Sequence, residues 1–218
     1  MGLNVTIPFK EQALALADSA DAAATKAGAA NLLLLGEDGT IAARNTDGLG
    51  LLIALGEQGF QPQGAKVAVI GAGGAARGAV DALLRAGVAE IQVLNRSLER
   101  AQALAELDSR ITALRDPAAA LRDANAVINA TSLGMDGQPP LHLALDAAPL
   151  SAVVMDMVYR PLETPLLKAA RERGHPTADG LAMLIGQAVP SFEALFGKSP
   201  PTTVKLRELC LAALAEAK

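Results

Sequence analysis

The chain is 218 residues long, which is enough for one large α/β domain or two small ones. Its net charge of −4 provides no broad basic surface, so the composition argues against a nucleic acid or an acidic membrane as partner. Hydrophobic residues make up 51% of the chain, yet no apolar run reaches the roughly 18 residues that a membrane-spanning helix needs. One cysteine and the absence of a signal-peptide pattern favour a cytoplasmic protein.

The N-terminal part is predicted to contain a strand, a long helix and a hairpin. Hydrophobic patterning and turn residues predict, in chain order, a strand at 3–7, one helix over 10–30, and strands at 31–35 and 40–45. Pro8 ends the first strand. Asp38 and Gly39 form a dipeptide typical of hairpin turns.

The rest of the chain alternates apolar strands with helices. Strands are expected at 66–71, 90–95, 111–114, 125–131 and 151–159. Helices are expected at 49–60, 79–87, 97–107, 116–124 and 164–174, and two more at 180–197 and 202–218. Strand–helix–strand order between residues 66 and 174 predicts a parallel sheet with helices on both faces, a doubly wound, Rossmann-type α/β fold.

A glycine-rich segment, GAGGAA, follows the first of the parallel strands directly and opens a helix. This spacing is the dinucleotide fingerprint: Gly71 makes a tight turn, Gly73 lets the backbone approach a pyrophosphate, and Ala76 permits close helix packing. The helix N-terminus then faces the phosphates with its amide groups. The alternative is a purely structural turn. The residues expected to bind the cofactor are Gly71, Ala72, Gly73, Gly74 and Ala75.

The end of the next strand indicates which dinucleotide is bound. An NAD site usually has an acidic residue here, whereas this strand ends in Asn95, Arg96 and Ser97, with Arg100 one turn further on. Two arginines and a serine suit a 2′-phosphate through charge-assisted hydrogen bonds, so NADP is favoured over NAD. Glu99 is nearby, but helix geometry is expected to turn it outward. The alternative for the two arginines is a solvated start of a helix.

Seven motifs occur along the chain in a fixed order: GLNVTIPFK, NTDG, VAVIGAGGAARG, NRS, INATSLGM, DMVYRPLETPLL and DGLAMLIGQA. In this combination the chain resembles the shikimate dehydrogenase family, which includes quinate/shikimate dehydrogenases. The resemblance covers essentially the whole chain. It implies reversible reduction of 3-dehydroshikimate to shikimate with NADPH, in aromatic amino-acid biosynthesis, by a cytoplasmic enzyme.

The resemblance places the catalytic lysine at Lys10 and its partner carboxylate at Asp47. Hydride delivery to a ketone produces an alkoxide that must receive a proton, and a lysine at the mouth of a cleft can donate it. Its positive charge also stabilises the developing oxyanion. Asp47 is the weaker acid/base candidate and is expected to bind and orient. Each residue taken alone has the alternative of an ordinary surface charge.

The resemblance also assigns neutral polar residues to the substrate and loop residues to the nicotinamide. The expected substrate contacts are Thr6, Asn31, Tyr159 and Gln187, and the expected contacts on the nicotinamide side are Thr131, Ser132, Met157 and Gly180. Asn31 could instead simply start a strand, and Tyr159 could cap one. Gln187 lies on a helix with one apolar face, where an unpaired amide is costly unless it serves a ligand.

The family's substrate domain begins upstream of the lysine motif, with a strand and a loop of two serines that hold the substrate carboxylate. No such S-x-S segment occurs in this sequence, so we expect a truncated α/β substrate-binding domain. The strand at 3–7 would then form an unpaired sheet edge with an uncovered apolar face. The expected domains are 1–47 (substrate-binding remnant), 48–180 (NADP-binding) and 181–218 (helices that pack back on the substrate domain).

Three functional hypotheses stay open at the level of sequence: an NADP-dependent shikimate dehydrogenase, a paralogue that acts on quinate or an aminated analogue, and a catalytically impaired NADP-binding module. The expected partner is a small molecule, and a homodimer is one open assembly state. A metal enzyme is disfavoured, because His142 and His175 are far apart in sequence and there are no paired cysteines.

Overall fold

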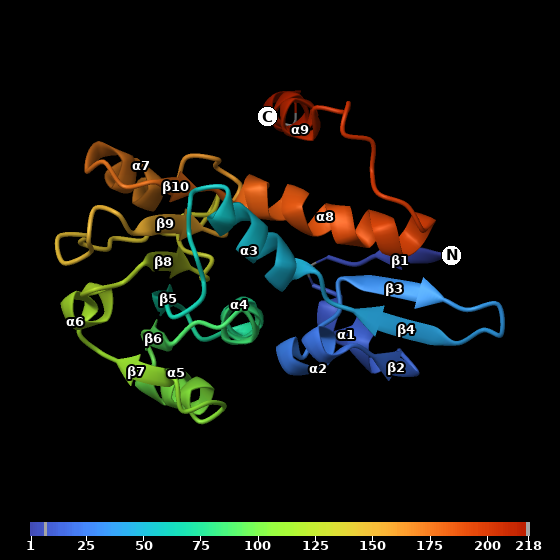
Figure 1. Cartoon of the computed structure of the whole chain (residues 1–218), viewed down its shortest axis with the longest axis horizontal. Coiled ribbons are helices and arrows are strands. Elements are labelled where there is room, and N and C mark those ends of the chain that lie inside the picture. The colour runs from blue at the N-terminus through green and yellow to red at the C-terminus, as the bar shows by residue number, and fades with distance from the viewer. Residues whose placement is uncertain (7, 217–218) are drawn as a thin grey trace.

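The computed structural model describes residues 1–6 and 8–216, and its strands within these residues form two sheets (Figure 1). The smaller sheet has the order β1-β3-β4-β2, and the larger one has the order β10-β9-β8-β5-β6-β7. Figure 1 shows the two sheets side by side, with helices α3 and α8 between them. Among the described residues, no helix combines the length and apolarity required to cross a membrane.

The smaller sheet is built from β1 (Gly2–Asn4), β2 (Ser19–Ala20), β3 (Leu32–Leu35) and β4 (Ile41–Arg44). The hairpin prediction is confirmed, since β3 and β4 pair antiparallel and Gly39 has a left-handed φ of 84° in their turn. The strand predicted at 3–7 is shorter than expected and begins one residue earlier; Ile7 of that prediction lies outside the described residues. As expected, β1 is an edge strand that pairs with β3.

The prediction of one helix over 10–30 is wrong. The segment contains α1 (Lys10–Ala15), the short strand β2 and α2 (Ala22–Ala27). Two aspartates cause the break: Asp18 accepts a hydrogen bond from Ile41 N–H at 2.8 Å, and Asp21 caps α2 by accepting from Ala24 N–H at 2.6 Å. Side chains of this type offer the backbone an alternative to helix continuation.

The larger sheet is parallel throughout its described pairs, as the sequence predicts. Its strands are β5 (Lys66–Ile70), β6 (Glu90–Leu94), β7 (Ile111–Leu114), β8 (Ala126–Asn129), β9 (Val153–Asp156) and β10 (Thr177–Ala178). The helices are α3 (Asp47–Gly56), α4 (Gly74–Arg85), α5 (Leu98–Ala105), α6 (Pro117–Leu121) and α7 (Pro165–Glu172), followed by α8 (Gly180–Phe196) and α9 (Leu206–Glu216). Strand β10 is an addition that the sequence patterns did not indicate.

Helices cover both faces of the larger sheet, and β5 shows this because its successive residues point to opposite faces and all contribute to a core. Val67 and Val69 belong to a core with α3, α4 and α5, whereas Ala68 and Ile70 belong to a second core with α6 and α7. The doubly wound fold is therefore confirmed. Its consequence for function is that the carboxyl ends of the strands meet at one edge, where ligands of such sheets bind.

Helix α8 returns from the larger sheet and packs against α3, β1 and β3. Helix α9 contacts α8, and its Arg207 pairs with Asp179, the N-cap of α8, at 2.5 Å. Burial raises the pKa of Asp179, but hydrogen bonds from Arg207 and from Ala182 N–H outweigh this, so the pKa is lowered overall. The carboxylate is thus ionised at neutral pH and holds the start of α8.

The contact between α3 and α8 is so close that glycine is required. A Cβ at Gly50 would lie 2.5 Å from the carbonyl oxygen of Met183 and 2.7 Å from the amide nitrogen of Gln187. From the other side, a Cβ at Gly186 would lie 3.1 Å from the carbonyl oxygen of Gly50. The two helix backbones therefore touch directly, which fixes the position of α8 relative to α3.

We expect Gly50→Ala to destabilise the protein by about 1–3 kcal/mol, because the methyl group would overpack the backbone of α8. The matched control is Gly56→Ala in the same helix, where a Cβ meets nothing within 4 Å. That change should be neutral or stabilise by up to about 1 kcal/mol. Urea unfolding followed by circular dichroism measures both, and equal stabilities of the two variants would contradict the close contact.

Candidate active site

Lys10 and Asp47 form an ion pair at the side of the smaller sheet that faces the larger one. Lys10 is the first residue of α1 and Asp47 is the first residue of α3. The Nζ of Lys10 lies 2.6 Å from Oδ2 of Asp47, and the two side chains are 25% and 28% exposed. The pair is thus formed within the protein but stays open to a ligand.

Two local features hold the Asp47 carboxylate in place. Asp47 lies in the first turn of α3, where the partial positive charge of the helix N-terminus favours an anion. The backbone N–H of Asp47 donates to Oδ1 of Asn45 at 3.0 Å, and Nδ2 of Asn45 donates in turn to the carbonyl oxygen of Ala29. The NTDG motif therefore forms a turn that aims the carboxylate at Lys10.

Asn31 connects this pair to the interior. Its side chain is buried, with 4% exposure. The Nδ2 group lies 3.0 Å from Oδ1 of Asp47 and 3.0 Å from Oε1 of Gln187, and Oδ1 accepts from the backbone N–H of Thr46 at 2.9 Å. The amide is therefore held in one orientation.

Gln187 of α8 completes the group, which we call the substrate cluster: Lys10, Asn31, Asp47 and Gln187. Its Oε1 accepts from Asn31, and Nε2 donates to the carbonyl oxygen of Leu184 at 3.0 Å. The amide thus has partners within the protein, and its burial alone does not require a ligand. What points to a ligand is that residues of α1, α3 and α8 and the residue just before β3 converge at one place.

Two residues that sequence reasoning missed support the cluster. The hydroxyl of Thr46 lies 3.1 Å from Oε1 of Gln187 and 3.0 Å from the hydroxyl of Ser191. Both residues are almost completely buried. Thr46 lies inside the NTDG motif, and Ser191 is four residues after Gln187, on the same face of α8. This helical spacing is the signal that could have identified Ser191.

The other two predicted substrate residues lie outside this network. Thr6 is exposed in the turn before α1, and Tyr159 is 41% exposed beyond the end of β9. Within the described part of the chain, neither side chain has a hydrogen-bonding partner. Both are therefore free to turn toward a ligand.

The glycine-rich loop has the geometry that a pyrophosphate requires. Gly71 has a left-handed φ of 117°, and its N–H donates to the carbonyl oxygen of Leu94 at 2.8 Å. A Cβ built at Gly73 or Gly74 meets nothing within 4 Å, and Ala72 and Ala75 continue the loop into α4. Open space therefore lies in front of the first amides of a twelve-residue helix. The loop fits a dinucleotide.

The loop after β6 presents two free guanidinium groups. Arg96 and Arg100 are exposed, and within residues 1–6 and 8–216 neither side chain has an ion-pair or hydrogen-bonding partner. Asn95 donates from Nδ2 to the carbonyl oxygen of Ser97 at 2.8 Å, which shapes the turn. These groups suit a 2′-phosphate.

Glu99 turns outward as expected, and it also contacts Ser97. It is exposed, but its Oε2 accepts from the hydroxyl of Ser97 at 2.7 Å. This hydrogen bond lowers the pKa of Glu99. Ser97 is therefore committed to a neighbouring carboxylate, and the two arginines are the stronger candidates for the phosphate.

The nicotinamide-side predictions fall at the carboxyl ends of β8 and β9. Thr131 and Ser132 lie in the loop after β8, one residue beyond its end, Met157 directly follows β9, and Gly180 begins α8. A Cβ at Gly180 would lie 2.4 Å from the carbonyl oxygen of Met157, so α8 packs tightly on this loop. Asn129, Asp156 and Thr164, which the sequence analysis did not select, form a buried hydrogen-bonded group beneath these residues.

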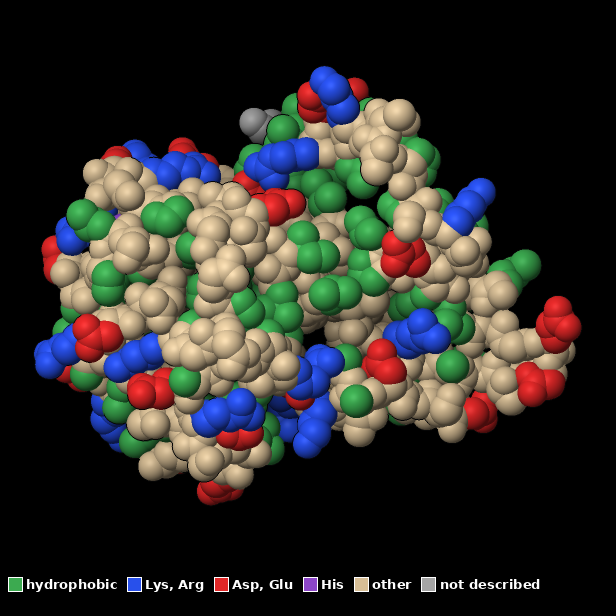
Figure 2. Space-filling view, in the orientation of Figure 1, with side chains coloured by type: hydrophobic (Ala, Val, Ile, Leu, Met, Phe, Trp, Pro, Cys, Tyr) green, Lys and Arg blue, Asp and Glu red, His purple; other side chains and the backbone are tan. Residues whose placement is uncertain are grey.

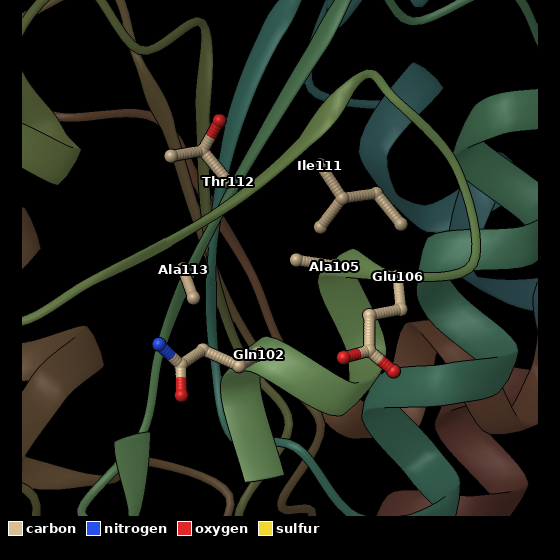
Figure 3. A pocket seen from close by; sticks show the side chains of 6 residues that line it. All are labelled: Gln102, Ala105, Glu106, Ile111, Thr112 and Ala113. Atoms are coloured by element: carbon tan, nitrogen blue, oxygen red, sulfur yellow. The ribbon is translucent and has the colours of Figure 1, made fainter. Parts of the chain in front are cut away.

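Two hollows show where space is available. Figure 2 shows a hollow between the two halves of the molecule, and a cavity of about 390 Å³ there is lined by residues of α2, β4, α3 and α4 and includes Thr46. The second is an open depression beside β7 and α5 (Figure 3), and neither lining contains a residue that the sequence analysis assigned to the site. Its lining residues are Gln102, Ala105, Glu106, Ile111, Thr112 and Ala113. Within the described residues, no group of three or more His, Cys, Asp or Glu could hold a metal.

A parallel sheet with a dinucleotide-type glycine loop, together with a lysine–carboxylate pair at the starts of two helices next to a second sheet, is the arrangement of a two-lobed Rossmann-type dehydrogenase. Comparison with known proteins identifies the family of dehydrogenases to which the chain is similar. The model of the shikimate dehydrogenase substrate-binding domain matches residues 1–33, and that of shikimate/quinate 5-dehydrogenase matches residues 54–135.

Among curated proteins, the shikimate dehydrogenase (NADP(+)) of Dinoroseobacter shibae is 50% identical over 97% of this chain and 78% of its own length. The solved shikimate 5-dehydrogenase of Thermus thermophilus, in complex with NADP(H) and shikimate, is 37% identical with a TM-score of 0.82, over 92% of this chain and 74% of that one. The quinate dehydrogenase of Corynebacterium glutamicum, in complex with NAD, is 34% identical with a TM-score of 0.86, over 97% and 77%. The chain belongs to the shikimate dehydrogenase family.

We expect Gly73→Ala to leave the fold stable but to weaken NADP⁺ binding. The backbone of Gly73 has an ordinary φ of −90°, and the added methyl group would fill only the space meant for the phosphates. A loss of roughly 1–2 kcal/mol corresponds to about tenfold in Kd. Isothermal titration calorimetry measures it, with Gly56→Ala as the control, and an unchanged Kd in Gly73→Ala would place the phosphates elsewhere.

Proposed function

We propose that the chain is an NADP-dependent shikimate dehydrogenase, which reversibly reduces 3-dehydroshikimate to shikimate with NADPH. The observation that carries this proposal is the half-open pair of Lys10 and Asp47, which the buried Asn31 joins to Gln187 of α8. Accordingly we propose residues 1–47 and 181–218 as the substrate-binding part and residues 48–180 as the cofactor-binding domain.

Lys10 is proposed as the proton donor in the reduction. The bound cofactor supplies a hydride to the carbonyl carbon, and the carbonyl oxygen then becomes an alkoxide. The ammonium group of Lys10 stabilises this charge and transfers a proton to the oxygen. In shikimate oxidation the neutral amine takes the same proton from the hydroxyl. Asp47, 2.6 Å away, orients Lys10 and accepts a hydrogen bond from the substrate hydroxyl.

The remaining polar groups are proposed to bind and orient. Asn31 and Gln187 are already held by hydrogen bonds, so they can contact the substrate hydroxyls with little loss of conformational freedom. Thr6 and Tyr159 add contacts from their exposed positions. For the cofactor, we propose that Gly71–Ala75 hold the pyrophosphate and that Asn95, Arg96, Ser97 and Arg100 surround the 2′-phosphate. Thr131, Ser132, Met157 and Gly180 line the nicotinamide side.

Quinate is the second candidate substrate, favoured by the similarity to the Corynebacterium glutamicum quinate dehydrogenase. Initial rates with shikimate and with quinate, each with NADP⁺ and NAD⁺, separate the two. Equal kcat/KM for both acids would contradict the first proposal. A third outcome, NADP⁺ binding without turnover of either acid, would identify a cofactor-binding module.

Two further properties, the cellular location and the assembly state, complete the proposal. We propose a cytoplasmic location, on the basis of the single cysteine and the biosynthetic role. We also propose a homodimer as the assembly state. Size exclusion with light scattering tests the second, and a monomer peak at all concentrations would contradict it.

We expect Lys10→Ala to lower kcat for shikimate oxidation by about 10³-fold, because the reaction loses its acid/base group. The Kd for NADP⁺ should stay unchanged, since Lys10 is outside the proposed nucleotide site. Stopped-flow absorbance of NADPH measures kcat, and Lys26→Ala on α2 is the control for loss of a surface charge. A Lys10→Ala variant with kcat within fivefold of the unaltered protein would contradict the assignment.

We expect Arg96→Ala to raise the KM for NADP⁺ by roughly 10- to 100-fold, because charge-assisted hydrogen bonds to the 2′-phosphate are worth about 1.5–3 kcal/mol. The KM for NAD⁺ should not change, since NAD⁺ lacks that phosphate. Steady-state kinetics with both cofactors measures the ratio, and Arg122→Ala, another exposed arginine, is the control. If both KM values rise together, Arg96 has a different role.

A further inference from the structure

The carboxyl ends of β8 and β9 carry a buried polar pair that the proposed chemistry does not use. Asn129 and Asp156 are register partners in these neighbouring parallel strands, and both are completely buried. Nδ2 of Asn129 donates to Oδ1 of Asp156 at 2.9 Å. Figure 1 shows both strands ending toward α3 and α8, where the cofactor is proposed to bind.

Apart from its bond to Asp156, Asn129 uses its hydrogen-bonding capacity on the loop after β8. Its Oδ1 accepts from the backbone N–H and the hydroxyl of Thr131, at 3.0 and 2.7 Å. The second hydrogen of Nδ2 goes to the carbonyl oxygen of Leu133 at 3.1 Å. The Thr131 hydroxyl also accepts from Leu133 N–H, so its orientation is fixed.

Asp156 holds the loop after β9 in the same way. Its Oδ1 accepts from the backbone N–H of Val158 at 3.0 Å, and its Oδ2 accepts from the hydroxyl of Thr164 at 2.7 Å. Thr164 is itself the N-cap of α7 and is 1% exposed. Burial raises the pKa of Asp156, while the three donors around it favour its ionised form.

The two loops carry the residues assigned to the nicotinamide. Thr131 lies in the first loop and Met157 in the second, and the backbone N–H of Met157 donates to the carbonyl oxygen of Asn129 at 3.1 Å. The buried pair is therefore the link through which both loops keep a fixed separation. No member of the substrate cluster hydrogen-bonds to it within the described residues.

We infer that Asn129 and Asp156 are positioning residues, which fix the two nicotinamide-side loops relative to each other and thereby set the hydride-transfer geometry. The inference rests on the proposed NADP-dependent reaction. Although the buried pair touches neither ligand, it controls cofactor binding and kcat. It does not control shikimate binding. Small displacements of reacting groups are costly, since about 1 Å of misplacement lowers rates by up to about 100-fold.

The test uses the pair Thr164→Val and Thr164→Ser, together with Asp156→Asn. Valine has nearly the shape of threonine but cannot donate to Asp156, whereas serine keeps the hydroxyl. In Asp156→Asn, the new amide faces the Thr164 oxygen, and the hydroxyl hydrogen loses its buried partner. We expect Thr164→Val and Asp156→Asn to lower kcat by about 10- to 100-fold and to raise the NADPH Kd several-fold. The KM for shikimate should stay within twofold, and Thr164→Ser should restore wild-type values.

Asp116→Ala is the control for loss of a helix cap, since Asp116 caps α6 by accepting from Ala118 N–H at 3.0 Å. It should lower the melting temperature without changing kcat or Kd. If Thr164→Val lowers the melting temperature in the same way and leaves kcat and the NADPH Kd unchanged, the pair is merely structural and the inference is wrong. If Asp156→Asn does not fold, the two Thr164 variants decide. If the unaltered chain binds NADPH but turns over neither acid, the proposed function fails, and the NADPH Kd of the variants still decides the inference.

Discussion

The backbone contact between α3 and α8 is the constraint on which the site depends. Gly50 and Gly186 let the two helices touch without side chains between them. Helix α3 begins with Asp47, and α8 carries Gln187, so this contact brings a carboxylate and an amide that are far apart in sequence into one cluster. The start of α8 packs on the loop after β9 through Gly180. One helix therefore connects the substrate cluster with the nucleotide edge of the larger sheet.

The polar groups of the molecule fall into two kinds with different physical demands. Asn129, Asp156 and Thr164 are buried and fully hydrogen-bonded, which makes them rigid, because an unsatisfied buried polar group is costly. Lys10 and Asp47 are paired but about one quarter exposed, so a ligand can replace part of their hydration. The rigid group thus supports the loops after β8 and β9, while the open pair lies at the starts of α1 and α3, held by Asn31 and Asn45.

The parts of the fold that sequence could predict are those set by local patterns. The strand–loop–helix unit around Gly71 follows from an apolar run, a glycine spacing and a helix signal, and the structure contains it, although α4 begins at Gly74, five residues before the predicted start. The alternation of strands and helices after this unit predicted a parallel sheet, and the structure confirms it. The single helix predicted over 10–30 failed because β2 exists only through pairing with β4, and Asp18 contacts Ile41, a residue distant in sequence. The sequence pattern of residues 10–30 cannot indicate β4 or Ile41, because both lie outside that segment.

The site was predictable to the extent that single motifs carry it. Lys10, Asn31, Asp47 and Gln187 were named from sequence, and the structure brings them together. Ser191 and the pair Asn129–Asp156 were missed, because they act on other residues and their meaning depends on strand register and helix facing. Family motifs identify the residues expected to contact ligands. The fold is needed to show which other residues hold those side chains in place.

If the substrate cluster is the active site, catalysis depends on the fixed separation of α3 and α8. The most direct measurement is kcat for shikimate oxidation by Gly50→Ala at a temperature where the variant is fully folded, with the NADP⁺ Kd measured alongside. We expect kcat to fall by at least tenfold while NADP⁺ binds with nearly unchanged affinity, since the substrate cluster is displaced. A folded Gly50→Ala variant with the kcat of the unaltered protein would contradict it.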